Sequence, residues 1–523
     1  MATEFYWLFQ RSGRHIVSFI ICILLLTIQI LPLSWSGNEI NYFDLAYQQV
    51  RPDLYGPGHA VFDSSRSRFL SFWIIGSVID AVGFEPAKTI LALLCIALYA
   101  GALTGLAIAL GLGPAAIAVT LNVYFVKQSL LGGEWLFGTV EPKLFAYILV
   151  IAGIASAVSG RWSASVVLMA LGTAFHFLVG GFWGAAVLVL HRLSRNHWRA
   201  TLLLLTLFAM LVSPIVALLV QDRVGVGADM TGLDRSLAEI YSAYRASHHV
   251  APFEHGMHKF ALSWFPGLLA HFGLALAFFV MRRDFGPQSA FALWVAGLNA
   301  FILVAVAVAF LDRHTHLVAP LYIFRPSALI LLLSVLLLVW RVVLALDTAL
   351  QRSPVMPTAL LVAAFVLLTV VLNAARLAFT AKIDQRLAVS IRGPELGVLD
   401  WLLENTGPGY LILVQPSSGD GSLDEGNAFP GGLERLTRAS FYVNYKFVPT
   451  SPADVAEWYR RLQQRRAIFE GDCARLAAIE PTFLIMRSGT NATPLEKCTE
   501  IVYRNDSYLI LRPNVGSRGG PYR

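Results

Sequence analysis

Long apolar segments separated by short polar ones occupy most of the chain. Between His15 and Arg376 these segments are about 20 residues long, the length that an α-helix needs to cross a bilayer. From Ala381 onward, polar and apolar residues are mixed as in water-soluble proteins. The pattern predicts an α-helical polytopic membrane domain of about 10–12 spans over residues 1–380, followed by a soluble domain over 381–523. The candidate spans are 16–35, 68–83, 88–111, 114–131, 143–159, 163–190, 200–220, 259–281, 288–311, 325–346 and 357–377.

Residues 112–191 are harder to divide, because their apolar pieces are short and are interrupted by glycine and proline. The piece 114–131 either crosses the bilayer or re-enters it. The piece 163–190 is either one long helix or two helices broken near Gly180–Gly181. Broken helices at membrane depth are tolerated where they line a cavity or are buried in protein, so this region is a candidate part of a site.

Strand-like and helix-like segments alternate in the C-terminal domain, which predicts a small α/β sandwich with a largely parallel sheet. The predicted strands are 387–391, 410–414, 441–443, 483–486, 501–503 and 508–511, and the predicted helices are 394–405 and 452–465. The Gly/Ser/Asp-rich stretch 417–432 is typical of a long loop. Earlier in the chain, Leu233–Ser247 has an amphipathic pattern that predicts a helix lying on the membrane surface.

Composition supports a membrane protein and indicates its orientation. Hydrophobic residues make up 56% of the chain and charged residues 14%, whereas soluble proteins carry about a quarter charged residues. The net charge of +7 comes with arginines that flank apolar segments, so it indicates topological anchoring and no nucleic-acid partner. Placing these arginines in the cytoplasm puts the loops 36–67, 221–258 and 312–324 and the C-terminal domain outside. We therefore expect a multi-pass protein of the inner (plasma) membrane with a cytoplasmic N-terminus.

Two of the four cysteines bear on this orientation. Cys473 and Cys498 lie in the predicted extracytoplasmic domain, where they either form a disulfide or remain as two free thiols. Cys22 and Cys95 lie in apolar segments and are expected to pack as small hydrophobic residues.

The first outward loop carries two acids, Glu39 and Asp44. A carboxylate at the membrane surface could act as a general base and take the proton from an acceptor hydroxyl. The alternative is that Asn38 caps a helix and that both acids are solvated.

A second group of polar residues follows the span 288–311. Arg325 begins an apolar run just before Pro326, and arginine suits phosphate because its planar fork of donors stays charged. The alternative is an arginine at the interface that extends toward water. The other members of this group are Asp312, Arg313, His314 and His316.

Several further polar residues are candidates with a structural alternative. Glu134, Glu141 and Lys143 lie beside the short helices and could contact a substrate or pair with one another. His176 is a lone histidine in an apolar run, which is more typical of a packed core. His248 and His249 lie near other histidines, but the spacing fits no strong metal motif. The sequence indicates no cofactor, and a divalent metal, although compatible with these residues, is not indicated either.

The layout and one motif resemble the GT-C superfamily of polytopic glycosyltransferases, which use polyprenyl-phosphate sugars as donors. Asn38-Glu39-x-x-Tyr42, followed by Ala46, is similar to the Asp-Glu-x-x-Tyr-x-x-x-Ala pattern of the family's first outward loop. The family's leading acid is replaced by Asn38, so Glu39 or Asp44 would have to serve as the base. His176 and Arg325 also occur where comparable polar residues interrupt later spans.

The resemblance implies a glycosyltransferase that moves a sugar from a polyprenyl-phosphate donor to a glycan or lipid acceptor on the outer face. Arg325, with Arg313 or His316, would then bind the donor phosphate, and the C-terminal domain would help bind the acceptor. Two other functions stay open: a transporter or flippase of a lipid-linked sugar, and a non-catalytic cell-envelope assembly protein. Transporters often show internal repeats, and none is evident in this sequence.

Overall fold

The computed structural model describes residues 2–31, 35–55, 67–221, 227, 229–352, 393–417, 429, 432–446, 448–489 and 494–514. The predicted span 357–377, the predicted strand 387–391 and most of the predicted loop 417–432 lie outside the described residues. The chain forms two compact units. The first consists of Met1–Pro32, Thr89–Ala217 and Ala246–Arg386, and the second of Leu33–Lys88, Leu218–Arg245 and Leu387–Arg523.

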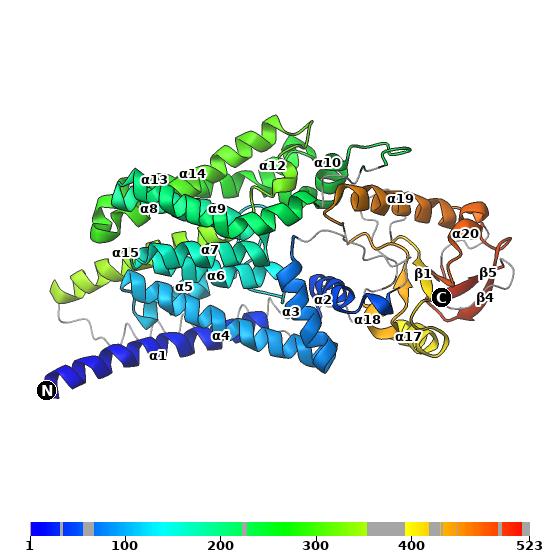
Figure 1. Ribbon diagram of the computed structural model, residues 1–523, viewed down its shortest axis with the longest axis horizontal. Coiled ribbons are helices and arrows are strands. Elements are labelled where there is room, and N and C mark those ends of the chain that lie inside the picture. Colours follow the sequence, from blue (N-terminus) through cyan, green and yellow to red (C-terminus); the bar gives the residue numbers. More distant parts are fainter. Residues whose placement is uncertain are drawn as a thin grey trace. The chain divides into compact units, whose positions relative to one another are not determined.

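The first unit is built from helices that run alongside one another (Figure 1). Two short 3-10 helices join them, η3 (Arg282–Gln288) and η4 (Ala319–Leu321). The helices α4, α9 and α11 cross the sequence boundary between the two units. The helices are α1 (Ala2–Ile30), α4 (Phe84–Leu110), α5 (Pro114–Val126), α6 (Pro142–Val158), α7 (Trp162–Phe175), α8 (Phe177–Arg195), α9 (Trp198–Gln221), α11 (Arg245–Val250), α12 (Gly256–Ser263), α13 (Phe265–Met281), α14 (Ser289–Leu311) and α15 (Ser327–Arg352).

Apolar helices of this unit expose their side chains, as expected for a protein surrounded by lipid. Four helical stretches in the described part are long and apolar enough to cross a membrane: Phe84–Leu110, Phe177–Arg195, Trp198–Gln221 and Phe265–Leu311. In α9, only 6% of the most apolar stretch is buried. An exposed apolar surface of that size is not compatible with water. The fold class is therefore that of a polytopic helical membrane protein, as predicted.

The ambiguous region 112–191 contains two short helices and one break. Helix α5 ends at Val126 after 13 residues, too few to cross the hydrocarbon core of a bilayer. The piece 163–190 is two helices, but the break lies at His176, which has an extended backbone (φ −155°, ψ 104°), and not at Gly180–Gly181. Gly180 instead allows α7 and α8 to approach closely, because a β-carbon there would lie 2.0 Å from the backbone nitrogen of Thr173.

The second unit contains a five-stranded sheet between helices, which confirms the predicted α/β domain. The strand order is β2-β1-β3-β5-β4. The pairs β1–β2 and β1–β3 are parallel, and β3–β5 and β4–β5 are antiparallel. The sheet is thus mixed and not largely parallel, because a short turn at Asn505–Ser507 makes β4 and β5 a hairpin. The strands are β1 (Leu411–Val414), β2 (Ser440–Phe441), β3 (Phe483–Arg487), β4 (Thr499–Arg504) and β5 (Tyr508–Pro513).

Alternate residues of the strands point to two separate cores. On one face, Leu413 and Leu484 pack with Trp458 of α19 (Pro452–Phe469). On the other face, Ile412 and Ile485 pack with α17 (Pro394–Asn405), and α17 and α19 cover opposite faces in Figure 1. The remaining elements of this unit are α2 (Gly37–Val50), η1 (Pro52–Leu54), α3 (Phe69–Val82), α10 (Leu237–Glu239), η2 (Ile240–Tyr244), α18 (Leu433–Thr437) and α20 (Cys473–Ile479).

The amphipathic segment 233–247 does not expose its apolar face to lipid, so that prediction is wrong. Ile240 and Tyr244 belong to the core beneath α19. The rings of Tyr244 and Tyr459 lie edge to face, with centroids 5.1 Å apart. The aromatic side chains of α19 therefore supply the apolar partner that the sequence pattern assigned to the membrane.

Cys473 and Cys498 form a disulfide, with their Cα atoms 5.9 Å apart. The bond ties the start of α20 to the residue before β4. Disulfides persist in oxidising compartments, which agrees with the predicted position of this domain outside the cytoplasm. Cys22 and Cys95 are buried and unbonded.

Candidate functional site

Helix α2 carries both acids of the first outward loop, and Glu39 has a structural role. Ser36, and not Asn38, is the N-cap. Its hydroxyl accepts from the Glu39 nitrogen at 3.2 Å, and its backbone nitrogen donates to Oε2 of Glu39 at 3.1 Å. Lys88 Nζ lies 3.4 Å from the same oxygen. Glu39 is thus held by a capping box and an ion pair, and it is buried, not solvated.

Asp44 is also buried, but its carboxylate is not engaged in the same way. Its side chain is 0% exposed. Within the part of the chain that the structure describes, neither of its carboxylate oxygens has a hydrogen-bond partner. A buried polar group without a partner costs free energy, and such groups are expected at functional sites more than elsewhere. Of the two candidate bases, Asp44 is the one with free acceptor atoms.

Helix α18 packs against the face of α2 that carries Asp44. Ile40, Asp44 and Tyr47 share one face of α2, since they are spaced by four and three residues. The Cβ position of Gly432 lies 3.4 Å from Cδ1 of Ile40, and the Arg438 guanidinium lies 5.2 Å from the centroid of the Tyr47 ring. Contacts at both ends of this face therefore come from the segment 432–438.

The charges on α18 affect the titration of Asp44. Burial raises the pKa of Asp44 to about 7, and the positive charges of Arg435 and Arg438 oppose this shift. Glu434 is 3% exposed, and burial followed by the negative charge of Asp44 raises its pKa well above the usual range. A carboxyl with a pKa near the working pH can exchange protons with a substrate.

A second polar cluster, in the first unit, is centred on Glu134. We call Glu134, Glu141, Lys143, His176, His249 and Arg325 the Glu134 cluster. Lys143 Nζ lies 3.3 Å from Oε2 of Glu134 and 3.5 Å from Oε2 of Glu141, and Arg325 Nε lies 3.3 Å from Oε1 of Glu134. Burial disfavours the charged carboxylate, but the charges of Lys143 and Arg325 outweigh it and hold the pKa of Glu134 at about 2.

The two histidines of this cluster have assignable protons. Arg325 Nη1 lies 3.0 Å from Nε2 of His176. Because a guanidinium only donates, Nε2 accepts and His176 is neutral. His249 Nδ1 donates to the Gly132 carbonyl at 2.6 Å, and burial lowers the pKa of His249. His176 is therefore an orienting partner of Arg325 and not an isolated core histidine.

Aromatic side chains hold the cations of the cluster in place. Arg325 stacks over the ring of Tyr322 at 4.2 Å, and its carbonyl accepts from the Tyr147 hydroxyl at 3.1 Å. Lys143 lies 3.7 Å from the centroid of the Trp135 ring. With both histidines neutral, the carboxylates of Glu134 and Glu141 balance the charges of Lys143 and Arg325. A phosphate that enters the cluster would therefore meet fixed hydrogen-bond donors in a site of little net charge.

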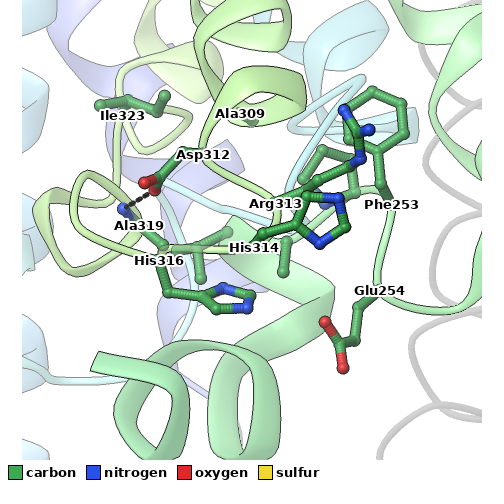
Figure 2. A pocket seen from close by; sticks show the side chains of 12 residues that line it. Phe253, Glu254, Ala309, Asp312, Arg313, His314, His316, Ala319 and Ile323 are labelled. Atoms are coloured by element: carbon green, nitrogen blue, oxygen red, sulfur yellow. Dashed lines mark hydrogen bonds between the residues drawn. The ribbon is translucent and has the colours of Figure 1, made fainter. Parts of the chain in front are cut away.

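Arg313 and His316 lie elsewhere, around a cavity of about 290 Å³. Figure 2 shows Arg313 beside Phe253, with His314 and His316 on the same loop. Asp312 also lines this cavity, but its carboxylate accepts from the backbone nitrogens of 317, 318 and 319 and from Thr315, so it organises the loop. Arg325 is not among the lining residues. The structure thus does not join Arg325 with Arg313 or His316 in one site, as the sequence had suggested.

One further predicted candidate, His248, completes the set. Its ring contacts that of His249, a member of the Glu134 cluster, with centroids 4.0 Å apart and planes inclined by 43°. In the described ranges, no group of three or more His, Cys, Asp or Glu side chains could hold a metal ion. No sequence pattern singles out Glu434, Arg435 or Arg438, because α18 is five residues long and follows the Gly/Ser/Asp-rich stretch 417–432.

No family model and no curated protein matches this chain. Among solved structures, the chain is similar to ArnT from Cupriavidus metallidurans bound to undecaprenyl phosphate, with 14% identity, full coverage of both chains and a TM-score of 0.48. The apo state of the same protein gives 15% identity, full coverage of both chains and a TM-score of 0.44.

Proposed function

We propose that the protein is a membrane glycosyltransferase that moves a sugar from a polyprenyl-phosphate donor to a hydroxyl group of a glycan or lipid acceptor on the outer face of the membrane. The observation that carries the proposal is Asp44, an enclosed carboxyl with a pKa of about 7 and with no hydrogen-bond partner among the described residues. The resemblance of its loop to the first outward loop of GT-C enzymes supports the proposal. The disulfide supports an outer face.

Asp44 would act as the general base. The acceptor hydroxyl gives its proton to the Asp44 carboxylate while its oxygen forms a bond to the anomeric carbon of the donor sugar. The bond between that carbon and the phosphate oxygen breaks, and its electron pair stays on the phosphate. Access to Asp44 requires that the side chains covering it move when the acceptor binds, since catalytic contacts often form only in the substrate complex.

Within the first unit, Arg325 and Lys143 are the candidate ligands of a polyprenyl phosphate. The phosphate gains negative charge as the glycosidic bond breaks, so cations that contact it bind the transition state more tightly than the donor. The hydrogen bond from Arg325 to His176 and the stacking on Tyr322 orient the guanidinium beforehand. Glu134 keeps both cations in position until the phosphate enters.

The test is sugar transfer by the purified protein in lipid nanodiscs, with radiolabelled polyprenyl-phosphate hexoses and pentoses as donors and envelope lipids as acceptors. We expect Asp44→Asn to lower the rate at least 100-fold. The matched control is Glu39→Gln, which replaces a buried acid on the same helix with an amide that a capping box accepts, and it should keep the rate within fivefold.

Two outcomes would contradict the proposal. Full transfer by Asp44→Asn would remove Asp44 as the base. Movement of intact labelled donor between leaflets, without transfer to any acceptor, would favour the transporter function.

A further inference from the structure

We propose that Asp44 and Glu434 form a carboxyl pair that shares one proton, in which Glu434 is a positioning residue that donates a hydrogen bond to the Asp44 carboxylate. The catalytic meaning of this pair rests on the proposed function, but the pair itself does not. Glu434 was not a candidate on sequence grounds and is far from Asp44 along the chain.

The packing of α18 on α2 brings the two carboxyls together. Gly432 meets Ile40 at one end of the contact, and Arg438 meets Tyr47 at the other. Asp44 lies between Ile40 and Tyr47 on the same face of α2, and Glu434 lies between Gly432 and Arg438. The two side chains therefore occupy the middle of one helix–helix contact.

Both carboxyls are enclosed and have unused acceptor atoms. Asp44 is 0% and Glu434 3% exposed. Within the described residues, both oxygens of Asp44 and Oε1 of Glu434 have no hydrogen-bond partner. Two buried carboxylates cannot both remain ionised at close range. A single proton held between them gives the pair one internal hydrogen bond and reduces its charge to −1.

The groups around the pair are consistent with a charge of −1. Arg435 and Arg438 of α18 provide positive charge, but Arg435 also bonds to Glu85. Glu39 on α2 is already paired with Lys88, and Asp80 on α3 with Arg51 at 3.1 Å. The remaining titratable neighbours are Tyr47 on α2 and Tyr55, whose pKa is raised by burial and by the charges of Asp44 and Glu434.

The pair assigns different tasks to its members. Burial raises the pKa of Asp44 to about 7, but the positive charges of Arg435 and Arg438 favour its ionised form. Burial and the negative charge of Asp44 raise the pKa of Glu434 well above its usual range and favour its protonated form. Asp44 is thus the ionised member and Glu434 keeps the proton. When an acceptor hydroxyl transfers its proton to Asp44, the pair becomes neutral, and the proton later leaves to solvent.

The sign of the pH effect on stability follows from these shifts. An acid whose pKa is raised in the folded state holds a proton that the unfolded chain has lost, so the folded state loses stability as pH rises from the unfolded pKa through the folded pKa. Asp44 and Glu434 should therefore destabilise the protein as pH rises from 5 to 9. Like-charge repulsion makes the loss larger when both carboxyls are present.

The experiment is a double-mutant cycle of heat unfolding, measured as the midpoint in mild detergent at pH 5 and pH 9. The proteins are the wild type, Asp44→Asn, Glu434→Gln and the double variant, with Glu470→Gln, an exposed acid of the same unit, as the matched control. The fall of the double variant reports all other titrating groups and is subtracted from the other three falls. After this subtraction, we expect the wild-type fall to exceed the sum of the falls in the two single variants. The double variant should fall least, and Glu470→Gln should behave as the wild type.

After subtraction of the double variant's fall, single-variant falls that add up to the wild-type fall would overturn the pair, because independent carboxyls are additive. If Glu434→Gln does not fold, the cycle is repeated with Glu434→Met, which has a side chain of similar length.

Transfer activity then separates the proposed pair from the proposed enzyme. With Glu434→Gln, the acidic limb of the rate profile should move up by about one pH unit, since an amide donates a weaker hydrogen bond to Asp44 than a carboxylic acid does.

The outcomes for the pair and for the enzyme are distinguishable. A non-additive cycle without any sugar transfer would keep the pair and reject the glycosyltransferase. Transfer that depends on Asp44, together with an additive cycle and an unchanged pH profile in Glu434→Gln, would keep the enzyme and reject the pair.

Discussion

At the scale of single residues, burial separates side chains that the sequence presents as equivalent. Glu39 and Asp44 are both fully buried acids on α2. Glu39 is held by the helix cap and by Lys88. The Asp44 oxygens have no hydrogen-bond partner in the described part of the chain, which leaves them the proton that we propose on Glu434. An acid whose hydrogen bonds are complete is stabilised as a carboxylate, while an acid without them is free to exchange a proton.

The contrast between a side chain with buried partners and one without them also applies to Arg325 and Arg313, and it leads to a prediction. Arg325→Lys should weaken the binding of the proposed polyprenyl phosphate about 10- to 100-fold, because lysine lacks the planar fork and cannot both contact His176 and face a phosphate. The measurement is the shift in unfolding temperature during a titration with a polyprenyl phosphate. Arg313→Lys is the matched control, because Arg313 is exposed and lies at the separate cavity. Equal weakening by both variants would mean that the phosphate does not bind at the Glu134 cluster.

At the scale of elements, the break between α7 and α8 is what directs His176 toward Arg325. The extended backbone of His176 interrupts the helix, and its ring reaches the guanidinium at 3.0 Å. Gly180, one turn into α8, then packs against the backbone of α7. The position of the histidine thus depends on a helix contact that only glycine permits.

Gly180→Ala is the test of that dependence. Its β-carbon would collide with the Thr173 backbone, and the separation of the two helices should cost about 1–3 kcal/mol of unfolding free energy and weaken the binding of the proposed polyprenyl phosphate. Gly181→Ala is the control, because nothing lies within 4 Å of its β-carbon position. A stable Gly180→Ala protein with unchanged binding would show that the contact does not position His176.

Helices could be predicted from the sequence more reliably than the sheet or the sites. The helix predicted at 394–405 has the observed bounds, since its apolar spacing is local. The order of the strands and the partner of the segment 233–247 depend on contacts between distant residues. The link between Asp44 and α18 is of the same kind. Arg325 and His176 were found because polar residues in apolar runs are unusual, but their shared partner Glu134 becomes evident only in three dimensions.

At the scale of the whole molecule, each compact unit is assembled from three separate pieces of chain. The second unit combines the first outward loop, the residues that follow α9 and the C-terminal domain. The proposed base Asp44 and its neighbours Glu434, Arg435 and Arg438 therefore come from opposite ends of the sequence. The predicted boundary near Ala381 lies outside the described residues, and the sidedness of the domain stays a prediction.

The disulfide allows two properties of the domain to be tested: its contribution to stability and the side of the membrane on which the domain lies. Cys473 and Cys498 are 25 residues apart, and closing a loop of that size contributes about 3 kcal/mol in the chain-entropy model. Replacing both by serine should lower the unfolding free energy by an amount of that order, measured by denaturant titration. In intact cells, a reducing agent that does not cross the membrane followed by an impermeant thiol reagent should label the wild type. No labelling without permeabilisation would contradict an outer location.

The ion pair between Glu134 and Arg325 also has a consequence for biosynthesis. The two residues are 191 positions apart, and a ribosome adds about 5–20 residues per second, so roughly 10–40 s separate their synthesis. A desolvated carboxylate without a counter-charge costs several kcal/mol. Lys143 follows Glu134 by only nine residues and is the first cation available to it. The lysine thus accompanies the acid during insertion into the membrane, before the later arginine completes the cluster.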